Sequence, residues 1–479
     1  PEVIPSVQEW YGYEGDVKLT ENSRIVLKDG AGVGLNKVAS QFKSDMKDIT
    51  GMELEIVNGE SGDGDDILIE SLPEDTYDTG EEGYLLKADD SGIHISSNGY
   101  TGCLYGTKTL EQVYYTQDGT YSFPKGVTRD FSQYEVRGVM IDIARVPYRL
   151  DALKDIVKTF SFYKINEVHF HLNDNRHSGA TTGREDYNNW KNYKGMFRLE
   201  SKTFPSLKTD PQNNTYYNDE NGAYGGEPQY TAEEYKDLQQ FAMDCGMNPI
   251  SEIDAPGHSL LFNRYVRNNI EEIRKVQGFE NMPEDGIKSD RDWELLSVKG
   301  ESGQWALKFL KALYSEYLNE ADPVFLGDTV DIGVDEYWSI KNDEFDGMRN
   351  YIREMADTVQ ESGKKVRMWG SMKQYFDDKG ISTKDYTDIE IDFWANSWDN
   401  AAKRSAEGFK IVNVDSFHLY GNTGRDKRDV VNVEHIFNNW TPVTFSSSGT
   451  VQPADPNLLG AKTAMWADIA DMGVTERDN

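Results

Sequence analysis

The chain has 479 residues, of which 37% are hydrophobic and 28% charged, and its 50 basic and 83 acidic side chains leave a net charge of −33. This acidic excess argues against a nucleic-acid-binding protein, which needs a basic surface to neutralise phosphates, and against binding to an anionic membrane. We expect a neutral ligand and two or three domains, because an α/β barrel alone takes about 250 residues.

Few features indicate a cellular compartment. Cys103 and Cys245 are too few for a disulfide framework and lie in no metal-ligand spacing, which fits the cytosol or a bacterial exoprotein without disulfides. No stretch approaches the roughly 20 consecutive apolar residues of a membrane span. The chain opens at Pro1 without the pattern of a secretion signal, and we expect any such signal to have been removed.

Residues 1–132 are predicted to form a small α+β domain. Short runs with alternating apolar residues predict strands, and two segments with apolar residues at helical spacing predict helices. The predicted strands are Arg24–Lys28, Glu53–Val57, Asp66–Glu70, Tyr84–Lys87 and Gly92–Ser96, and the predicted helices are Val33–Met46 and Gly102–Tyr115. Nothing in this part of the sequence indicates catalytic chemistry.

Residues 133–479 are predicted to form a second domain, in which apolar strands alternate with helices. Eight near-continuous apolar runs favour a parallel sheet closed into a (β/α)8 TIM barrel, so the fold class is α/β. The predicted strands are Val136–Asp142, Glu167–Asn173, Asn248–Asp254, Thr329–Asp335, Val366–Ser371, Ile389–Ala395, Lys410–Ser416 and Ala461–Asp468. The predicted helices are Leu150–Tyr163, Ala232–Cys245, Gly303–Leu318, Gly347–Gly363 and Asn400–Gly408.

The C-terminal ends of these strands carry the residues of chemical interest, because catalytic groups of TIM barrels lie at that end. The residues found there are Asp142, Arg145, His171, Asp174, Asp254, His258, Asp335, Glu336, Trp369, Trp394, Tyr420, Trp466 and Asp468. Such a gathering of carboxylates and tryptophans exceeds what a structural rim requires and predicts an active site.

Asp335 and Glu336 are the strongest candidates for catalysis. Neighbouring strand residues point to opposite faces, so both carboxyl groups reach one ligand only where the strand ends and bends. In a glycosidase one carboxyl group protonates the leaving oxygen while the other stabilises positive charge on the sugar. The alternative is a pair of solvated acids at the start of a loop.

The tryptophans extend this interpretation, because indole rings pack against the apolar C–H faces of sugars. Trp369, Trp394 and Trp466 come from different strands and could enclose one pyranose ring, with core packing as the alternative for each. Arg145 could hold sugar hydroxyl groups through its forked donors or could form a structural ion pair.

Two histidines raise the question of a metal. His169 and His171 lie two residues apart and point to the same face of a strand, as in metal-dependent barrel hydrolases. The later strands Val366–Ser371 and Ile389–Ala395 supply no further histidine, so no metal or other cofactor is expected. His258 is predicted to bridge Asp174 and Glu336, with a structural core histidine as the alternative.

Five segments in order at these strand ends resemble glycoside hydrolase family 20, the β-N-acetylhexosaminidases. The segments are Arg137–Arg145, Tyr163–Asn166 with His169–Asp174, Glu252–Ser259, Ile332–Glu336 and Ala464–Asp468, and Gly92–Leu110 resembles the end of the family's N-terminal domain. The resemblance covers residues 84–479. It implies a retaining mechanism in which the substrate's own 2-acetamido oxygen attacks the anomeric carbon and forms an oxazolinium ion.

The resemblance also implies roles for single residues. Glu336 would be the general acid and later the base, and Asp335 would orient the acetamido N–H and balance the oxazolinium charge. Tyr420 would donate its hydroxyl to the acetamido oxygen. The residues implied to bind the substrate or support Glu336 are Arg145, Asp174, His258, Trp369, Trp394, Trp466 and Asp468.

Three departures from the family pattern bear on specificity. Asp174-Asn175 replaces an Asp-Asp pair, His418–Tyr420 replaces Tyr-Leu-Asp or Tyr-Leu-Asn, and Trp466–Asp468 replaces Trp-Gly-Glu. The shorter acid at Asp468 could open the site to a second sugar, as a lacto-N-biosidase needs to release galactosyl-β-1,3-N-acetylglucosamine. The insertion Arg176–Tyr230 has aromatic residues to shape that subsite, namely Trp190, Tyr193, Phe197, Tyr216, Tyr217 and Tyr224.

The leading hypothesis is a substrate-assisted glycosidase that cleaves β-linked N-acetylglucosamine-containing units from glycans, with lacto-N-biosidase specificity preferred. The alternatives are a simple exo-β-N-acetylhexosaminidase that releases one N-acetylglucosamine or N-acetylgalactosamine, a carbohydrate-binding protein without catalysis, and a metal-dependent barrel hydrolase. The expected partner is a glycan or oligosaccharide, with no nucleic acid and no membrane insertion. We expect an extracellular or surface location in a bacterium, with the cytosol as the alternative.

Overall fold

The computed structural model describes residues 1–28, 33–60, 63–117, 119–177, 193–209, 229–338, 340–422, 431–446 and 451–467. The chain divides into two compact units. The first contains Pro1–Glu135, Ile156–Asn166 and Met243–Met247, and the second contains Val136–Asp155, Glu167–Ala242 and Asn248–Asn479. None of the described helices has the length and apolar composition needed to cross a membrane.

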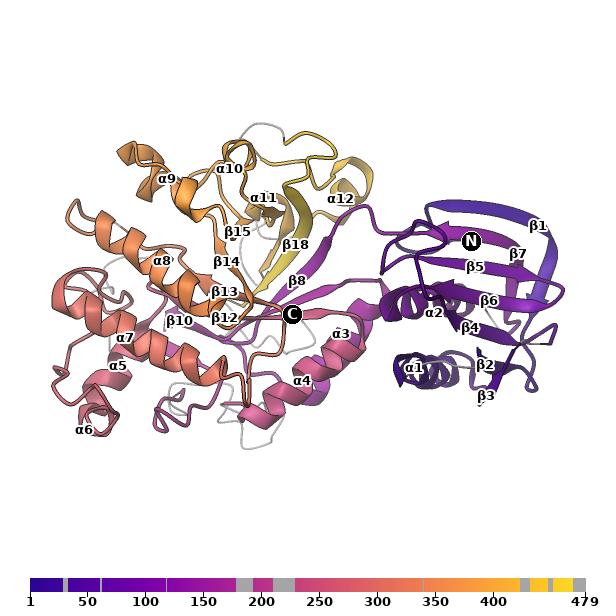
Figure 1. Cartoon of the computed structure of the whole chain (residues 1–479), viewed down its shortest axis with the longest axis horizontal. Helices are drawn as coiled ribbons and strands as arrows, with labels where there is room; N and C mark the ends of the chain where they lie inside the picture. The colour runs from indigo at the N-terminus through magenta and orange to yellow at the C-terminus, as the bar shows by residue number, and fades with distance from the viewer. Residues whose placement is uncertain are drawn as a thin grey trace. The chain divides into compact units, whose positions relative to one another are not determined.

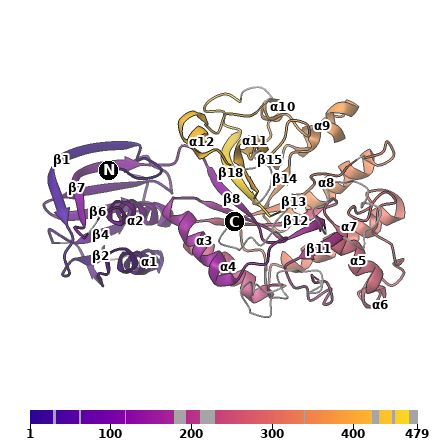
Figure 2. The same ribbon diagram turned by 180° about the vertical axis from the view of Figure 1, so that it is seen from behind.

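Among its described residues, the first unit contains a mixed sheet of seven strands and two complete helices (Figures 1 and 2). In sheet order the strands are β1 (Glu9–Lys18), β7 (Ser122–Asp130), β5 (Tyr84–Asp89), β6 (Gly92–Ser97), β4 (Ile67–Ser71), β2 (Arg24–Lys28) and β3 (Glu55–Gly59). Helices α1 (Val33–Thr50) and α2 (Tyr100–Tyr115) pack against each other and against the sheet. They bury an aliphatic and aromatic core that includes Ile25, Phe42 and Ile69.

The second unit contains a closed barrel of eight parallel strands. In order around the barrel they are β8 (Val136–Asp142), β9 (Glu167–His171), β12 (Asn248–Ala255), β13 (Thr329–Gly333), β14 (Lys365–Trp369), β15 (Ile389–Phe393), β16 (Ile411–Asn413) and β18 (Leu458–Trp466). The barrel closes because β18 pairs with both β16 and β8. The predicted TIM barrel, preceded by a small α+β domain, is confirmed.

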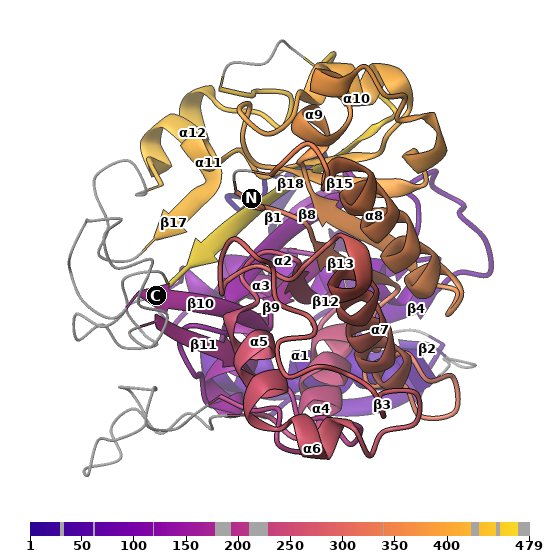
Figure 3. The ribbon, with the colours of Figure 1, turned by 90° about the vertical axis from the view of Figure 1, so that its left-hand side faces the viewer.

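Helices connect successive barrel strands, as an α/β barrel requires. They are α3 (Leu150–Phe162), α4 (Ala232–Asp244), α5 (Leu260–Asn268), α6 (Ile270–Ile273), α7 (Gly300–Tyr317), α8 (Phe345–Gln360), α9 (Met372–Tyr375), η4 (Asp377–Lys379), η5 (Lys384–Tyr386), α10 (Ala401–Glu407), α11 (Ser416–Leu419) and α12 (Val433–Asn439). Beyond β9, the strands β10 (Asn173–His177) and β11 (Tyr193–Phe197) form an antiparallel pair, and β17 (Tyr420–Asn422) runs beside β18 (Figure 3).

The interior of the barrel contains charged side chains in pairs. Arg367 Nη1 lies 2.6 Å from Glu167 Oε1, and Lys462 forms an ion pair with Asp392. All four residues are buried. A buried charge is tolerated only when a partner compensates its lost hydration, so each inner side chain is fixed by the one it faces.

Candidate active site

The site begins where β13 ends. Gly333, Val334 and Glu336 have φ angles of +74°, +84° and +44°, all in the left-handed region, so the chain leaves strand geometry after Gly333. A Cβ atom on Gly333 would lie 2.3 Å from Asp254 Oδ1 and 2.6 Å from Asp254 Cα. Only glycine fits at this point, and the bend in the chain depends on it.

The bend brings the carboxyl groups of Asp335 and Glu336 to one imidazole. His258 Nε2 lies 3.8 Å from Asp335 Oδ2 and 3.4 Å from Glu336 Oε2. The Asp335 side chain is 12% exposed, whereas the Glu336 side chain is 28% exposed. The two predicted catalytic acids therefore lie together, one nearly buried and the other partly exposed.

A second carboxylate holds His258 from behind. His258 Nδ1 lies 2.9 Å from Asp174 Oδ1. Burial opposes the charged imidazole, but Asp174 and Asp254 outweigh it and hold the pKa of His258 well above its ordinary value. His258 thus lies between Asp174 and Glu336, in the arrangement that the sequence indicated.

Arg145 forms ion pairs with two carboxylates. Its guanidinium lies 2.8 Å from Asp142 Oδ2 and 2.7 Å from Asp174 Oδ2, and its Nε donates to Asn175 O at 3.0 Å. Of the two roles considered for Arg145, binding of sugar hydroxyl groups or a structural ion pair, these contacts correspond to the ion pair. The guanidinium also lies over the ring of Trp466, 5.5 Å from its centroid.

Asp335 also lies close to a second buried acid, Asp254. One carboxylate oxygen each of Asp254 and Asp335 lies within 4.8 Å of the other and of a His258 ring nitrogen. Burial raises the pKa of Asp335 to about 6, with His258 opposing the rise and Glu336 adding to it. Burial and the charge of Asp335 raise the pKa of Asp254 well above its ordinary value. Both carboxyl groups therefore favour the protonated form more than an exposed aspartate does.

The predicted aromatic residues form one cluster at the strand ends. Trp394, Tyr420 and Trp466 are partly buried and pack against the core cluster that contains Trp369. The Trp466 ring centroid lies 5.8 Å from that of Trp369 and 5.8 Å from that of Tyr420. Trp369 itself is 1% exposed and packs in the core, whereas the other three keep accessible surface.

Two tryptophans that the sequence analysis did not single out extend this surface. Trp398 stacks on Trp394 with a centroid separation of 5.8 Å, and Trp338, which is 43% exposed, meets Trp398 at 5.2 Å. Trp338 lies two residues after Glu336, and Trp398 four residues after Trp394. A search for tryptophan just beyond each strand end would have found both.

Glu294 is a further acid near the site that the sequence did not indicate. Burial raises its pKa to about 7, with His258 opposing the rise. Its Oε1 is buried and has no hydrogen-bond partner within the described parts of the chain. Glu294 lies in the loop before α7, and its backbone carbonyl accepts from Ser259 N at 2.8 Å.

The ring nitrogens of His169 and His171 lie close to charged groups of the protein. His171 Nδ1 and Nε2 lie 2.5 Å from Glu252 Oε2 and 2.7 Å from Asp174 Oδ2. His169 Nε2 lies 2.9 Å from Glu252 Oε2, and its Nδ1 lies 2.8 Å from Lys462 Nζ. A metal ion bound to His171 would have to displace one of its two carboxylate contacts, which disfavours the metal-dependent alternative at this residue.

Several predicted subsite residues lie outside the described residues: Asp468, Trp190, Tyr216, Tyr217 and Tyr224. Tyr193 belongs to β11. The prediction for Phe197 was wrong, because this side chain is fully buried and its ring meets that of Phe262 at 5.6 Å. Its strand, β11, packs against α5, so Phe197 is part of the apolar core.

Family models match both parts of the chain. The model described as glycosyl hydrolase family 20, domain 2, matches residues 1–131. The model described as glycosyl hydrolase family 20, catalytic domain, matches residues 134–178 and 192–477. The second match includes the acid pair, His258 and the aromatic cluster.

Individual curated proteins are also similar to this chain. A lacto-N-biosidase of Bifidobacterium bifidum is 21% identical over 98% of this chain and 37% of its own length. A β-hexosaminidase of Akkermansia muciniphila is 31% identical over 37% of this chain and 32% of its own length. The chain spans about a third of the length of these curated relatives.

Solved structures share the fold. The N-acetyl-β-hexosaminidase of Streptomyces plicatus superimposes with a TM-score of 0.71 at 18% identity, over 97% of this chain and 85% of that one. The exo-β-N-acetylglucosaminidase of Vibrio harveyi gives 0.69 at 19% identity, over 98% and 70%. Together with the family models, which match most of the sequence, these findings show that the chain belongs to glycosyl hydrolase family 20.

Proposed function

We propose that this protein hydrolyses β-linked N-acetylglucosamine-containing glycosides with retention of configuration, using the substrate's own acetamido group as the nucleophile. The observation that carries the proposal is the convergence of Asp335 and Glu336 on His258 Nε2, beside a cluster of tryptophans. The acid pair supplies the proton and the charge balance, and the indoles supply flat apolar surfaces for a sugar ring.

In the first step Glu336 protonates the glycosidic oxygen while the acetamido oxygen bonds to the anomeric carbon and the leaving group departs. Glu336 is the partly exposed acid, as contact with a leaving group requires. His258 Nε2 lies 3.4 Å from Glu336 Oε2. The imidazole and the carboxyl group therefore share the proton that Glu336 transfers. In the second step Glu336 takes a proton from water, which opens the oxazolinium ion.

Asp335 is the proposed partner of the acetamido N–H. Its Oδ1 is buried and, among the described residues, has no hydrogen-bond partner. The indole Nε1 of Trp466 is likewise buried and without a partner in the described chain. A buried polar atom left unpaired costs about 1–3 kcal/mol, so each of these two atoms favours a ligand that pairs with it.

The proposed product is the disaccharide galactosyl-β-1,3-N-acetylglucosamine. The lacto-N-biosidase similarity extends over 98% of this chain, whereas that of the β-hexosaminidase of Vibrio furnissii covers 40%. The second candidate, release of a single N-acetylhexosamine, is favoured by the higher identity of that relative, 29% against 21%.

One comparison separates the two specificities. The 4-nitrophenyl glycosides of lacto-N-biose and of N-acetylglucosamine are assayed side by side, with product configuration followed by NMR. Turnover of the disaccharide alone supports the biosidase, and turnover of the monosaccharide alone supports the exo-enzyme. Equal hydrolysis of glucosides that lack the amide, or a product of inverted configuration, would refute the mechanism.

We also infer that the protein acts outside the cell or on its surface, where glycans of this kind are met. Immunodetection in culture supernatant, washed cells and lysate of the source organism tests this. Confinement to the cytosolic fraction would contradict the inferred location.

A further inference from the structure

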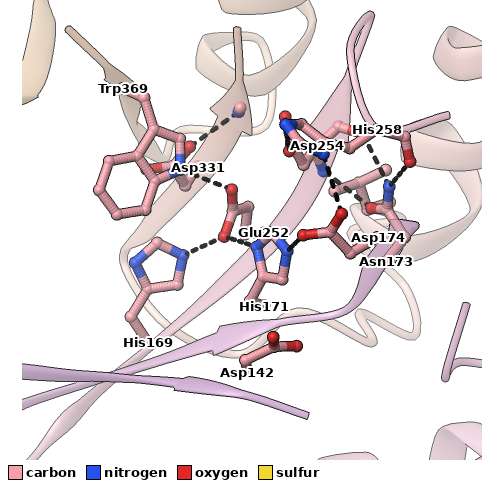
Figure 4. A network of polar contacts seen from close by, with 12 residues as sticks. Asp142, His169, His171, Asn173, Asp174, Glu252, Asp254, His258, Asp331 and Trp369 are labelled. Carbon is pink, nitrogen blue, oxygen red and sulfur yellow. Dashed lines mark hydrogen bonds and ion pairs between the residues drawn. The ribbon is translucent and has the colours of Figure 1, made fainter. Parts of the chain in front are cut away.

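We propose that Glu252 is a positioning residue that fixes two walls of the proposed site at once, through Trp369 on one side and through His171 and Asp174 on the other. This inference rests on the proposed function, because it assigns an effect on the acid Glu336. Glu252 lies on β12 and is fully buried in the barrel interior (Figure 4). It touches no atom of the proposed substrate and acts only through its neighbours.

The first contact holds the buried ring on which Trp466 packs. Trp369 Nε1 donates to Glu252 Oε1 at 2.7 Å. The Trp369 ring in turn lies against Trp466, with a centroid separation of 5.8 Å and an interplanar angle of 37°. A buried indole N–H needs one defined acceptor, so the carboxylate of Glu252 fixes the rotation of the ring on which Trp466 packs.

The second contact continues towards the acid. Glu252 Oε2 lies 2.5 Å from His171 Nδ1, and His171 Nε2 lies 2.7 Å from Asp174 Oδ2. Asp174 then holds His258, which faces Glu336. Both ring nitrogens of His171 face carboxylates, so both donate and the ring is an imidazolium.

The charges along this line alternate in sign. Burial disfavours the imidazolium, but Glu252 and Asp174 hold the pKa of His171 well above its ordinary value. Burial likewise disfavours the carboxylate, but His171 and His169 hold the pKa of Glu252 below its ordinary value. The other titratable groups whose charges act on Glu252 or respond to it are Asp254, Tyr314, Asp331 and Asp335. On the far side of His169, Lys462 Nζ lies 2.8 Å from His169 Nδ1.

A single substitution separates the two contacts. In Glu252→Gln the amide oxygen still accepts from Trp369, but the amide nitrogen then faces His171, which loses the acceptor on Nδ1 and the charge that keeps it protonated. Asp174 loses a cationic partner, and His258 is held less firmly behind Glu336. The indole side is left nearly intact.

The readout is the dependence of the rate on the leaving group. A dinitrophenolate departs with little help from an acid, whereas an alkoxide needs a well-placed proton donor, which contributes about 10²–10⁴-fold. We expect Glu252→Gln to lower kcat/KM for an alkyl glycoside at least tenfold more than for the dinitrophenyl glycoside of the same sugar. Trp369→Phe, which removes the indole N–H, should raise KM for both substrates by the same factor.

Glu167→Gln is the matched control. Glu167 is also a buried barrel carboxylate, but it pairs with Arg367 at 2.6 Å at the start of β9, away from the strand ends. This variant should change both leaving groups equally. Equal losses for the two leaving groups in Glu252→Gln would overturn the inference, whereas a wild-type protein inactive on every such glycoside would refute the proposed function instead.

If Glu252→Gln does not fold, the wild-type protein decides the question. In a sample with ¹⁵N-labelled histidine, His171 is identified through its contact with Trp466, whose ring centroid lies 5.0 Å away. We expect both His171 nitrogens to carry protons at pH 8. A neutral His171 ring at that pH would overturn the inference.

Discussion

The carboxyl group of Asp335 should lower the stability of the barrel at neutral pH. Burial raises the pKa of Asp335 from 3.8 to about 6, so the folded protein holds this proton more tightly than the unfolded chain does. Protonation of Asp335 therefore stabilises the folded protein. This stabilisation is complete below pH 4 and is lost as the pH rises through 6 and the carboxyl group ionises. The difference, 6 − 3.8, corresponds to about 3 kcal/mol at roughly 1.4 kcal/mol per pH unit.

Asp335→Asn removes this ionisation without changing the size of the side chain. At pH 7.5 the variant should be more stable than the wild type by up to about 3 kcal/mol, which for a domain of this size raises the melting temperature by roughly 4 °C. The gap should close towards pH 4.5, where the wild-type carboxyl group is protonated. Activity should be lost in the same variant, because the amide no longer balances the oxazolinium charge.

Thermal unfolding followed by tryptophan fluorescence at pH 4.5, 6 and 7.5 measures the gap. Asp378→Asn, which changes an exposed carboxylate of the same unit, is the control and should show no gain. A gain that is absent at pH 7.5, or that is equally large at pH 4.5, would show that the buried charge of Asp335 is not what limits stability.

Three further outcomes are expected. Glu336→Gln should lower kcat by about 10²–10⁴-fold on an aryl glycoside while the fold, checked by circular dichroism, is unchanged; a loss below tenfold would remove Glu336 as the acid. Tyr420→Phe should lower kcat by about 10²-fold with a small change in KM, as expected for one lost donor to a developing charge; a change in KM alone would assign Tyr420 to ground-state binding. Gly333→Ala should destabilise the protein by more than about 1–3 kcal/mol in urea unfolding, because φ is +74° and the new Cβ would meet Asp254 Oδ1 at 2.3 Å; unchanged stability would show that the bend after β13 tolerates a side chain.

The sequence was sufficient to predict where the barrel strands lie. The predicted ends of these strands were less accurate. The run Val136–Asp142 matches β8 at both ends. The predicted strand Thr329–Asp335 stops at Gly333, because Gly333 and Val334 both take positive φ angles. Hydrophobic periodicity carries no signal for a backbone bend of this kind.

In the first unit the sequence analysis missed β1 and β7. Most of β1 is exposed, so it shows no alternation of buried and exposed residues, and β7 contains Pro124 and Gly126, which are uncommon inside strands. The two strands pair with each other although more than 100 residues separate them, as in Glu9 with Arg129. Local patterns do not report such a pairing.

For the site, the sequence indicated the acids and His258 but not Glu252. The partners of Glu252 are Trp369, which is 117 residues away, and His171, which is 81 residues away. Strand-end position indicates which side chains face the mouth of a barrel. The same position does not indicate which buried residue, deeper in the barrel, holds those side chains in place.

The residues of β9 show how this deeper part of the barrel is built. Val168 and Phe170 point outwards, and Phe170 meets Tyr235 of α4 with ring centroids 5.9 Å apart. The inward positions hold Glu167, His169 and His171, so the apolar residues of this strand face the helices while its ionisable residues face the barrel interior. Removing one partner from a buried charged pair costs about 3–5 kcal/mol, so these side chains have little freedom to rearrange, and that rigidity is what a site built on aligned carboxyl groups needs.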